Sequence, residues 1–159
     1  MFFFGNITFA NTEVAKKERL IYFSIFEAKA NHVFQFSYLQ FVNLDFKADG
    51  FFIALYHSSS VYTPLSMDHL IFQGNRRGYM QLDSTVSDEQ LRKVIVITES
   101  TWHSHFVESS PLVRTIGNVQ LLLSDSFFIE NYSFREGTAI YVDQSLALIK
   151  NTTFLNNYA

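Results

Sequence analysis

The sequence predicts an all-β protein built as a single-stranded parallel β-helix, a solenoid of about six coils. Short segments rich in β-branched and aromatic residues recur along the 159 residues and are bounded by polar clusters, as strands are. Toward the C-terminal end, equivalent residues return every 26 residues. No block of helix-favouring Ala, Leu, Glu and Lys is present. Short strands whose equivalent residues recur in this way stack on one another, which is the arrangement of a solenoid.

The composition fits one globular domain over residues 1–159. Apolar residues make up 48% of the chain, which is too many for a disordered protein. Eighteen phenylalanines and eight tyrosines favour strands, whereas only six glycines and two prolines are present.

Charge and residue content exclude several classes of function. The net charge is −3 and the basic residues are dispersed, which argues against a nucleic-acid partner. The absence of cysteine excludes disulfides and thiolate metal sites, and no phosphate-binding glycine loop suggests a cofactor. No apolar run is long enough for a membrane-spanning segment, and the start at 1–5 is too short for a signal peptide. We expect no bound cofactor and no nucleic acid.

The repeat is clearest in three segments, 94–107, 120–133 and 146–159, which align without a gap in seven columns. Two columns are aliphatic, one is acid or amide, one is hydroxyl, two are aromatic and one is small. In that order they are Val96, Leu122 and Leu148; Ile97, Leu123 and Ile149; Glu99, Asp125 and Asn151; Ser100, Ser126 and Thr152; Trp102, Phe128 and Phe154; Phe106, Tyr132 and Tyr158; and Val107, Ser133 and Ala159. We expect the second column and the Trp102 column to point inward.

Earlier coils are looser. One aromatic anchor per coil continues the Trp102 column toward the N-terminus, and the steps between anchors shorten from 32 residues to 26. The sequence therefore predicts looser coils over 1–93 and regular 26-residue coils over 94–159, with variable loops between constant strands. The segments 57–64 and 84–93 are expected to project from the rod. The expected anchors are Phe9, Phe41, Phe72, Trp102, Phe128 and Phe154.

A second strand is expected in each coil, at 50–55, 111–116 and 137–142. Since like residues recur at one-unit spacing, each strand should lie on its equivalent in the next coil, about 4.8 Å away. An immunoglobulin-like sandwich also has many short strands, but it does not require equivalent residues in successive units. The repeat favours the β-helix.

The C-terminal units resemble the right-handed parallel β-helix repeats of pectin-lyase-like proteins. They are most similar to repeats of polymorphic outer-membrane autotransporters and of large protist surface proteins. "FIEN" at 128–131 and "FLNN" at 154–157 match the Phe-x-x-Asn element, and "GTAIY" at 137–141 matches the Gly-Gly-Ala-Ile element with Thr138 in place of the second glycine. The unit at Trp102 departs from the pattern, because His105 replaces the asparagine. The resemblance implies a right-handed coil, and such folds include lyases, hydrolases, adhesins and stalks.

Two acidic residues are candidates for catalysis. Glu99 and Asp125 occupy one column in adjacent coils, so their carboxylates can lie about 5 Å apart. Two carboxylates at that distance can act on a glycosidic bond, share a proton or bind a cation. The column continues as Asn151, however, and a hydroxyl residue follows each member. A ladder of polar residues at a turn therefore explains the pattern without catalysis, and we favour the ladder.

Histidines suggest no metal site. His103 and His105 lie two residues apart on an expected strand, so both should point to one face. A third ligand at suitable spacing is missing, and we predict surface histidines.

An apolar ridge is the candidate partner-binding site. If Ile97, Leu123 and Ile149 point inward, strand alternation turns Val96, Leu122 and Leu148 outward, with 94, 120 and 146 on the same face. Such a patch usually marks an interface, or it lies beneath a loop such as 84–93. We expect a lateral contact with another chain or with an adjoining domain.

The sequence ends within a repeat and shows no capping element after Tyr158. We therefore expect a fragment whose parent protein adds adjoining coils.

Two functions remain open. The first is a non-enzymatic surface or extracellular β-helix segment that acts as a spacer, adhesin or partner-binding rod, with a protein or carbohydrate partner at the cell surface. The second is a carbohydrate-active enzyme, a lyase or hydrolase of acidic polysaccharide, that would use Glu99 and Asp125. We favour the first, because no basic residue clusters with the two acids.

Overall fold

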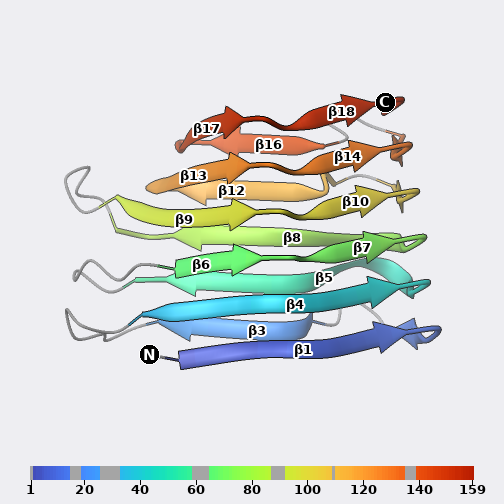
Figure 1. Cartoon of the computed structure of the whole chain (residues 1–159), viewed down its shortest axis with the longest axis horizontal. Helices are drawn as coiled ribbons and strands as arrows, with labels where there is room; N and C mark the ends of the chain where they lie inside the picture. The colour runs from blue at the N-terminus through green and yellow to red at the C-terminus, as the bar shows by residue number, and fades with distance from the viewer. Residues whose placement is uncertain are drawn as a thin grey trace.

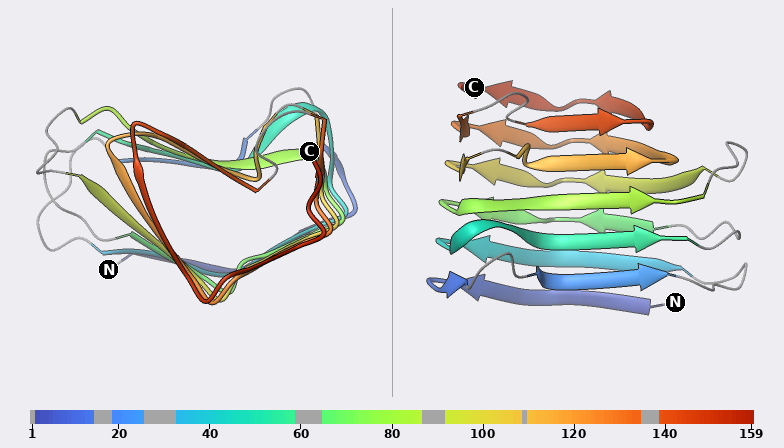
Figure 2. Two further views of the ribbon diagram at one scale, coloured as in Figure 1. Left: turned by 90° about the horizontal axis from the view of Figure 1, so that it is seen from above. Right: turned by 180° about the vertical axis from the view of Figure 1, so that it is seen from behind.

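The computed structural model describes residues 2–14, 19–25, 33–58, 65–86, 92–108, 110–134 and 139–159. These residues form two parallel sheets, and the chain winds from one sheet to the other as it ascends (Figures 1 and 2). In Figure 1 the strands of the first sheet run to the right in front and those of the second sheet return behind them, so the coil is right-handed. The described residues are all-β, and the fold is the predicted parallel β-solenoid.

Each sheet is a stack of short strands. The first sheet contains β1 (Phe2–Ala10), β4 (Phe34–Val42), β6 (Leu65–Asp68), β7 (Ile71–Gln73), β9 (Lys93–Thr98), β10 (Thr101–His103), β13 (Val119–Ser124), β14 (Phe127–Ile129), β17 (Leu146–Lys150) and β18 (Thr153–Leu155). The second sheet contains β2 (Glu13–Val14), β3 (Arg19–Ile25), β5 (Asp45–His57), β8 (Arg76–Ser84), β11 (Phe106–Val107), β12 (Val113–Gly117), β15 (Tyr132–Ser133) and β16 (Ile140–Asp143).

The first sheet has six levels: β1, β4, β6 with β7, β9 with β10, β13 with β14, and β17 with β18. Four of these levels lie between two others, so the described solenoid has about four complete turns. The predicted number of about six coils is therefore slightly too high. Among the described residues no helix is long and apolar enough to cross a membrane.

The predicted aromatic column runs through the interior. Phe41, Phe72, Trp102 and Phe128 are fully buried, and their rings stack on neighbouring anchors with nearly parallel planes. Successive centroids from Phe9 to Phe154 are 5.2, 4.9, 5.1, 4.3 and 5.0 Å apart. This spacing matches the distance between adjacent strands, so one ring per coil fills the core continuously. The 26-residue alignment is confirmed strand by strand.

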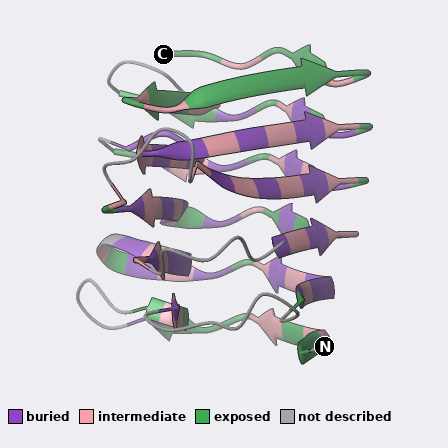
Figure 3. Cartoon of the chain, turned by 90° about the vertical axis from the view of Figure 1, so that its left-hand side faces the viewer, coloured by how far each residue is buried: buried purple, intermediate pink, exposed green. Residues whose placement is uncertain are grey.

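The predicted inward aliphatic column is also in register. Ile97 and Leu123 are buried, and Ile149 pairs with Leu123 in the next level. Ile149 and Phe154 are nevertheless 41% and 46% exposed, because no further strand level lies over them (Figure 3).

Two corners of every coil use left-handed backbone. The first corner lies within β1 and β4 and separates the two strands of each higher level of the first sheet, and the second corner separates that sheet from the next strand. Their residues have φ between +45° and +61°, a conformation that asparagine, aspartate and glycine adopt most readily. This explains the acid-or-amide column of the repeat. The first corner contains Asn6, Tyr38, His69, Glu99, Asp125 and Asn151, and the second contains Asn11, Asn43, Gly74, Ser104, Glu130 and Asn156.

An inward polar residue follows each corner in the regular coils. After the first corner, the buried Ser126 hydroxyl accepts the backbone N–H of Ser100 at 3.2 Å and donates to the Ser124 carbonyl at 2.7 Å. After the second corner, buried Asn131 accepts the backbone N–H of His105 at 3.0 Å. These side chains satisfy backbone groups that the turn leaves without strand partners.

The expectation that His103 and His105 share a face is wrong. Ser104 lies between them with φ of +54°, so the strand ends and the side-chain alternation is interrupted. His103 lies at the surface, whereas His105 is 2% exposed and takes the place of an asparagine in the interior.

The second strands lie where the sequence predicts them. β12 pairs with both β8 and β16, and β5 pairs with β8, all in parallel. Of the expected projecting loops, 59–64 and 87–91 lie outside the described residues.

Candidate functional site

Glu99 and Asp125 lie in the first corner, one level apart, and both are exposed. Their side chains bind different neighbours. Glu99 Oε2 lies 2.7 Å from Nε2 of His69 in the level below, and Asp125 Oδ1 accepts a hydrogen bond at 3.2 Å from Asn151 in the level above. The two carboxylates thus belong to a polar ladder that runs along the corner.

The corner network extends to Asp68. Its Oδ2 accepts hydrogen bonds from the Ser37 hydroxyl at 2.8 Å and from Gln35 at 3.1 Å, and its Oδ1 lies 3.0 Å from His69 Nδ1. Burial raises the pKa of Asp68, but the hydrogen bonds from His69, Gln35 and Ser37 outweigh burial and the net pKa is lowered. The carboxylate is therefore ionised, and both of its oxygens have partners. The Tyr38 ring stacks on His69, with 4.5 Å between centroids.

Within the described residues no group of three His, Asp or Glu side chains is arranged to hold a metal ion. His103 instead lies 3.2 Å from the Glu130 carboxylate, across the second corner.

The residues that follow the second corner form a column that we call the asparagine ladder, which contains Asn75, His105, Asn131 and Asn157. Its titratable member is His105. Burial lowers its pKa to about 4, an effect that the Phe72 carbonyl partly offsets and His103 reinforces. His57, also buried, has its pKa lowered to about 4 by burial and by the charge of Lys93. Both imidazoles are therefore neutral in the folded chain at neutral pH.

These two histidines predict acid sensitivity. Between about pH 6.5 and pH 4 the unfolded chain binds protons that the folded chain does not. The stability contributed by the neutral imidazoles is thus complete above about pH 6.5 and is lost as the pH falls toward 4. For His105 the loss is up to about 3 kcal/mol. Chemical denaturation should give a lower free energy of unfolding at pH 4.5 than at pH 7.5. In His105→Asn this difference should be smaller, and the part that remains is due to His57. An unchanged loss in His105→Asn would contradict this assignment.

The predicted apolar ridge faces outward, as expected. Burial alternates along β9 and β13, so Val96 and Leu122 are half-buried between fully buried neighbours. Leu148 follows in β17 and is 49% exposed. Below Val96 the same column is polar, at Ser66 and Gln35, which confines the ridge to the last three levels. We define the ridge as Val94, Val96, Leu122, Leu146 and Leu148, with Gln120 among them.

The sequence analysis left open that segment 84–93 covers the ridge. This segment is described only at its two ends, because residues 87–91 lie outside the described residues.

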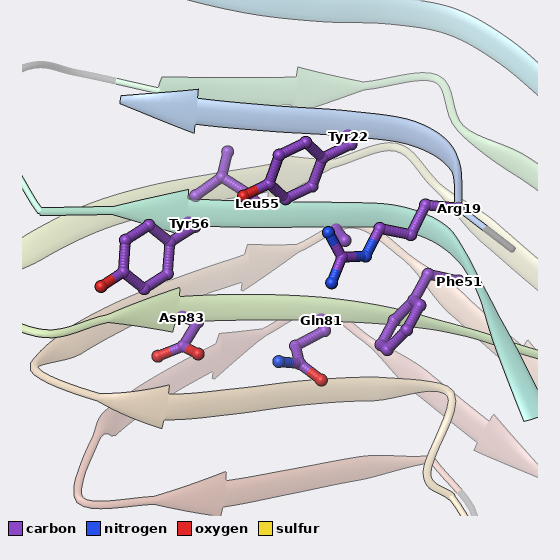
Figure 4. Close-up of a pocket in the computed structure, with 8 residues that line it drawn as sticks. Arg19, Tyr22, Phe51, Leu55, Tyr56, Gln81 and Asp83 are labelled. Carbon is purple, nitrogen blue, oxygen red and sulfur yellow. The ribbon is translucent and has the colours of Figure 1, made fainter. Parts of the chain in front are cut away.

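A second surface feature is a shallow hollow on the outer face of the second sheet (Figure 4). Ala54 of β5 pairs with Tyr22 of β3 on one side and with Gln81 of β8 on the other. Because alanine is small, the larger side chains on the adjacent strands stand around it and leave a depression of about 110 Å³. It is lined by Arg19, Tyr22, Phe51, Ala54, Leu55, Tyr56, Gln81 and Asp83.

The hollow combines aromatic rings with polar groups. The Arg19 guanidinium lies 4.5 Å from the Tyr22 ring centroid and 5.6 Å from that of Phe51. Burial raises the pKa of Asp83, although Gln81, Arg114 and the Ser84 backbone oppose the shift. Sequence analysis could not indicate this site, since its residues come from three coils and belong to no recognisable motif.

No protein-family model, no curated protein and no solved structure matches this chain.

Proposed function

We propose that this chain is a non-enzymatic part of a surface or extracellular β-solenoid, which acts as a rod and binds a partner through the ridge. The supporting observation is the outward column of Val96, Leu122 and Leu148, of which the first two are half-buried and the third is 49% exposed. Apolar side chains aligned on adjacent strands form a continuous strip, and such strips usually mark an interface. The resemblance of the C-terminal units to repeats of autotransporters and protist surface proteins supports the proposed location.

The corner ladder supports a non-enzymatic role. A pair of catalytic carboxylates requires one group to change its protonation state in concert with a substrate. Glu99 and Asp125 are instead held by His69 and Asn151 in opposite directions along the stack.

Charging the ridge tests the partner-binding role. The double variant Leu122→Lys with Leu148→Lys should abolish self-association in sedimentation velocity. The contact would bury two ammonium groups, and the free energy needed to desolvate them opposes association. Its circular dichroism should remain of the β type, since both side chains point away from the core. Gln40→Lys with Ser66→Lys adds the same charge to the same sheet at lower levels and should leave association unchanged. Unfolding of the first variant, or equal association in both, would contradict the proposal.

A panel of pectins and uronans tests the enzymatic alternative. We expect neither unsaturated products nor new reducing ends. If the unmodified chain forms product and Glu99→Gln does not, the protein is a polysaccharide-degrading enzyme and the proposed rod function is wrong.

A further inference from the structure

We infer that the hollow around Ala54 is a binding subsite for a neutral saccharide, held between Tyr22 and the polar groups of Gln81 and Asp83. The inference goes beyond the proposed function, because it assigns a second binding surface and names the class of ligand that this surface takes. The hollow lies on the second sheet, whereas the ridge lies on the first, so the two surfaces can be tested separately.

The shape suits one ring of a longer ligand. A depression of about 110 Å³ is well below the size of pockets that enclose a small molecule. It is open to the surface, so an extended chain can place one unit in the hollow while its other units remain in solvent. Beyond the hollow, the outward column Tyr22, Ala54 and Gln81 continues as Arg114 and Tyr141.

The aromatic groups suit the apolar face of a sugar ring. Tyr22 is 52% exposed, and Phe51 is half-buried beside it. Tyrosine offers a rigid apolar ring with a polar end, and so it contacts C–H groups and hydroxyls together. Arg19 is held against both rings, which orients its planar set of N–H donors toward Gln81 (Figure 4).

The polar groups suit hydroxyls. The Asp83 carboxylate already accepts a hydrogen bond from Gln81 but has further lone pairs for a ligand hydroxyl, and the Gln81 carbonyl oxygen can accept another. Burial of Asp83 means that part of its hydration is already removed in the free protein, so contact with a ligand costs less further desolvation.

The charge of the lining favours a neutral ligand over an acidic one. One cation, Arg19, and one anion, Asp83, line the hollow, so it carries no net charge. A uronate carboxylate near Asp83 would meet a like charge at a partly desolvated site, and pairing it with Arg19 instead would contribute little, because Arg19 is exposed to solvent. Adjacent hydroxyls of a neutral sugar instead satisfy the donor and the acceptor at once. For one ring bound at an open surface we expect a Kd of about 1 mM.

The test is a titration of the whole chain, labelled with ¹⁵N, with four neutral hexasaccharides (β-1,3-glucan, β-1,4-glucan, mannan and xylan) and with hexagalacturonate. We expect at least one neutral probe to shift the amide signals of Tyr22, Ala54 and Gln81, and hexagalacturonate to shift none of them. Tyr22→Ala and Asp83→Asn should each weaken binding about tenfold.

The matched control is Tyr141→Ala. Tyr141 lies in the same outward column, is 44% exposed and has Arg114 5.7 Å from its ring centroid, but it does not line the hollow. The Kd of this variant for the neutral probe should lie within about twofold of that of the unmodified chain.

Three outcomes overturn the subsite: no neutral probe binds, hexagalacturonate binds through these residues, or Tyr141→Ala weakens binding as much as Tyr22→Ala. Cleavage of a bound probe would contradict the proposed non-enzymatic function, but it would not contradict the location of the subsite.

Discussion

Replacing Trp102 with alanine is expected to lower the free energy of unfolding by about 3–5 kcal/mol. Trp102 is fully buried in the middle of the aromatic column, with Phe72 and Phe128 stacked on its two faces at 5.1 and 4.3 Å. Truncation removes both contacts and leaves a cavity that neighbouring coils cannot close without losing their strand pairing. Equilibrium denaturation measures the loss.

Two variants control for the substitution. Phe154→Ala removes a ring from the same column in the exposed last level and should lower the free energy of unfolding by about 1 kcal/mol. Trp102→Phe maintains the stack and removes an indole N–H that has no hydrogen-bond partner among the described residues, so it should cost less than about 1.5 kcal/mol. A loss for Trp102→Ala no larger than that for Phe154→Ala would mean that the column is not the core.

Replacing Asn131 with leucine is expected to lower the free energy of unfolding by about 3 kcal/mol. The side chain is fully buried; it accepts the His105 backbone N–H at 3.0 Å and donates to the Trp102 carbonyl at 3.0 Å and to Asn157 at 2.8 Å. Leucine has a similar size but leaves the two backbone groups without this partner in an interior that water does not reach. Thermal or chemical unfolding gives the loss directly.

Asn157→Leu is the matched control. Asn157 makes the corresponding bond to the Phe128 carbonyl at 2.7 Å but is only partly buried in the last level, so water can replace its hydrogen bonds. Its loss should be less than half that of Asn131→Leu. Equal losses at the two positions would show that the ladder does not act through buried backbone groups.

The sequence was sufficient to predict the register of the first sheet. In the last three levels its two strands per coil are separated only by a two-residue corner, so Val96, Leu122 and Leu148 recur without insertions and align by eye. The inward aromatic column follows from the same spacing. The number of complete turns was slightly overestimated, because terminal levels were counted as coils.

The corners explain what the sequence analysis could not resolve. Periodicity alone does not show that Ser104 has left-handed backbone, so His105 was assigned to the surface although it occupies an asparagine position in the ladder. The same conformation at Glu99 and Asp125 gives a physical reason for their column, which the sequence left open between a ladder and a catalytic pair.

The hollow could not be predicted, because the second sheet follows a different spacing. The number of residues between successive strands of this sheet varies, so Tyr22, Ala54 and Gln81 follow one another at irregular steps although their strands pair directly. A small residue between two large ones in one outward column becomes visible only when that pairing is known.

The register of the coils underlies the ridge, the ladders and the hollow, and one disulfide experiment tests it most directly. The chain has no cysteine, so every thiol or disulfide that is detected comes from the two substituted positions. Val96 and Leu122 are paired neighbours in β9 and β13, about 4.8 Å apart, whereas Val96 and Leu148 are separated by two levels, about 10 Å. A disulfide requires Cα atoms within about 7 Å. In dilute solution, mass spectrometry after mild oxidation should find an intrachain disulfide in Val96→Cys with Leu122→Cys and free thiols in Val96→Cys with Leu148→Cys. Free thiols in the first pair, or preferential bonding of the second, would contradict the stacked 26-residue coils.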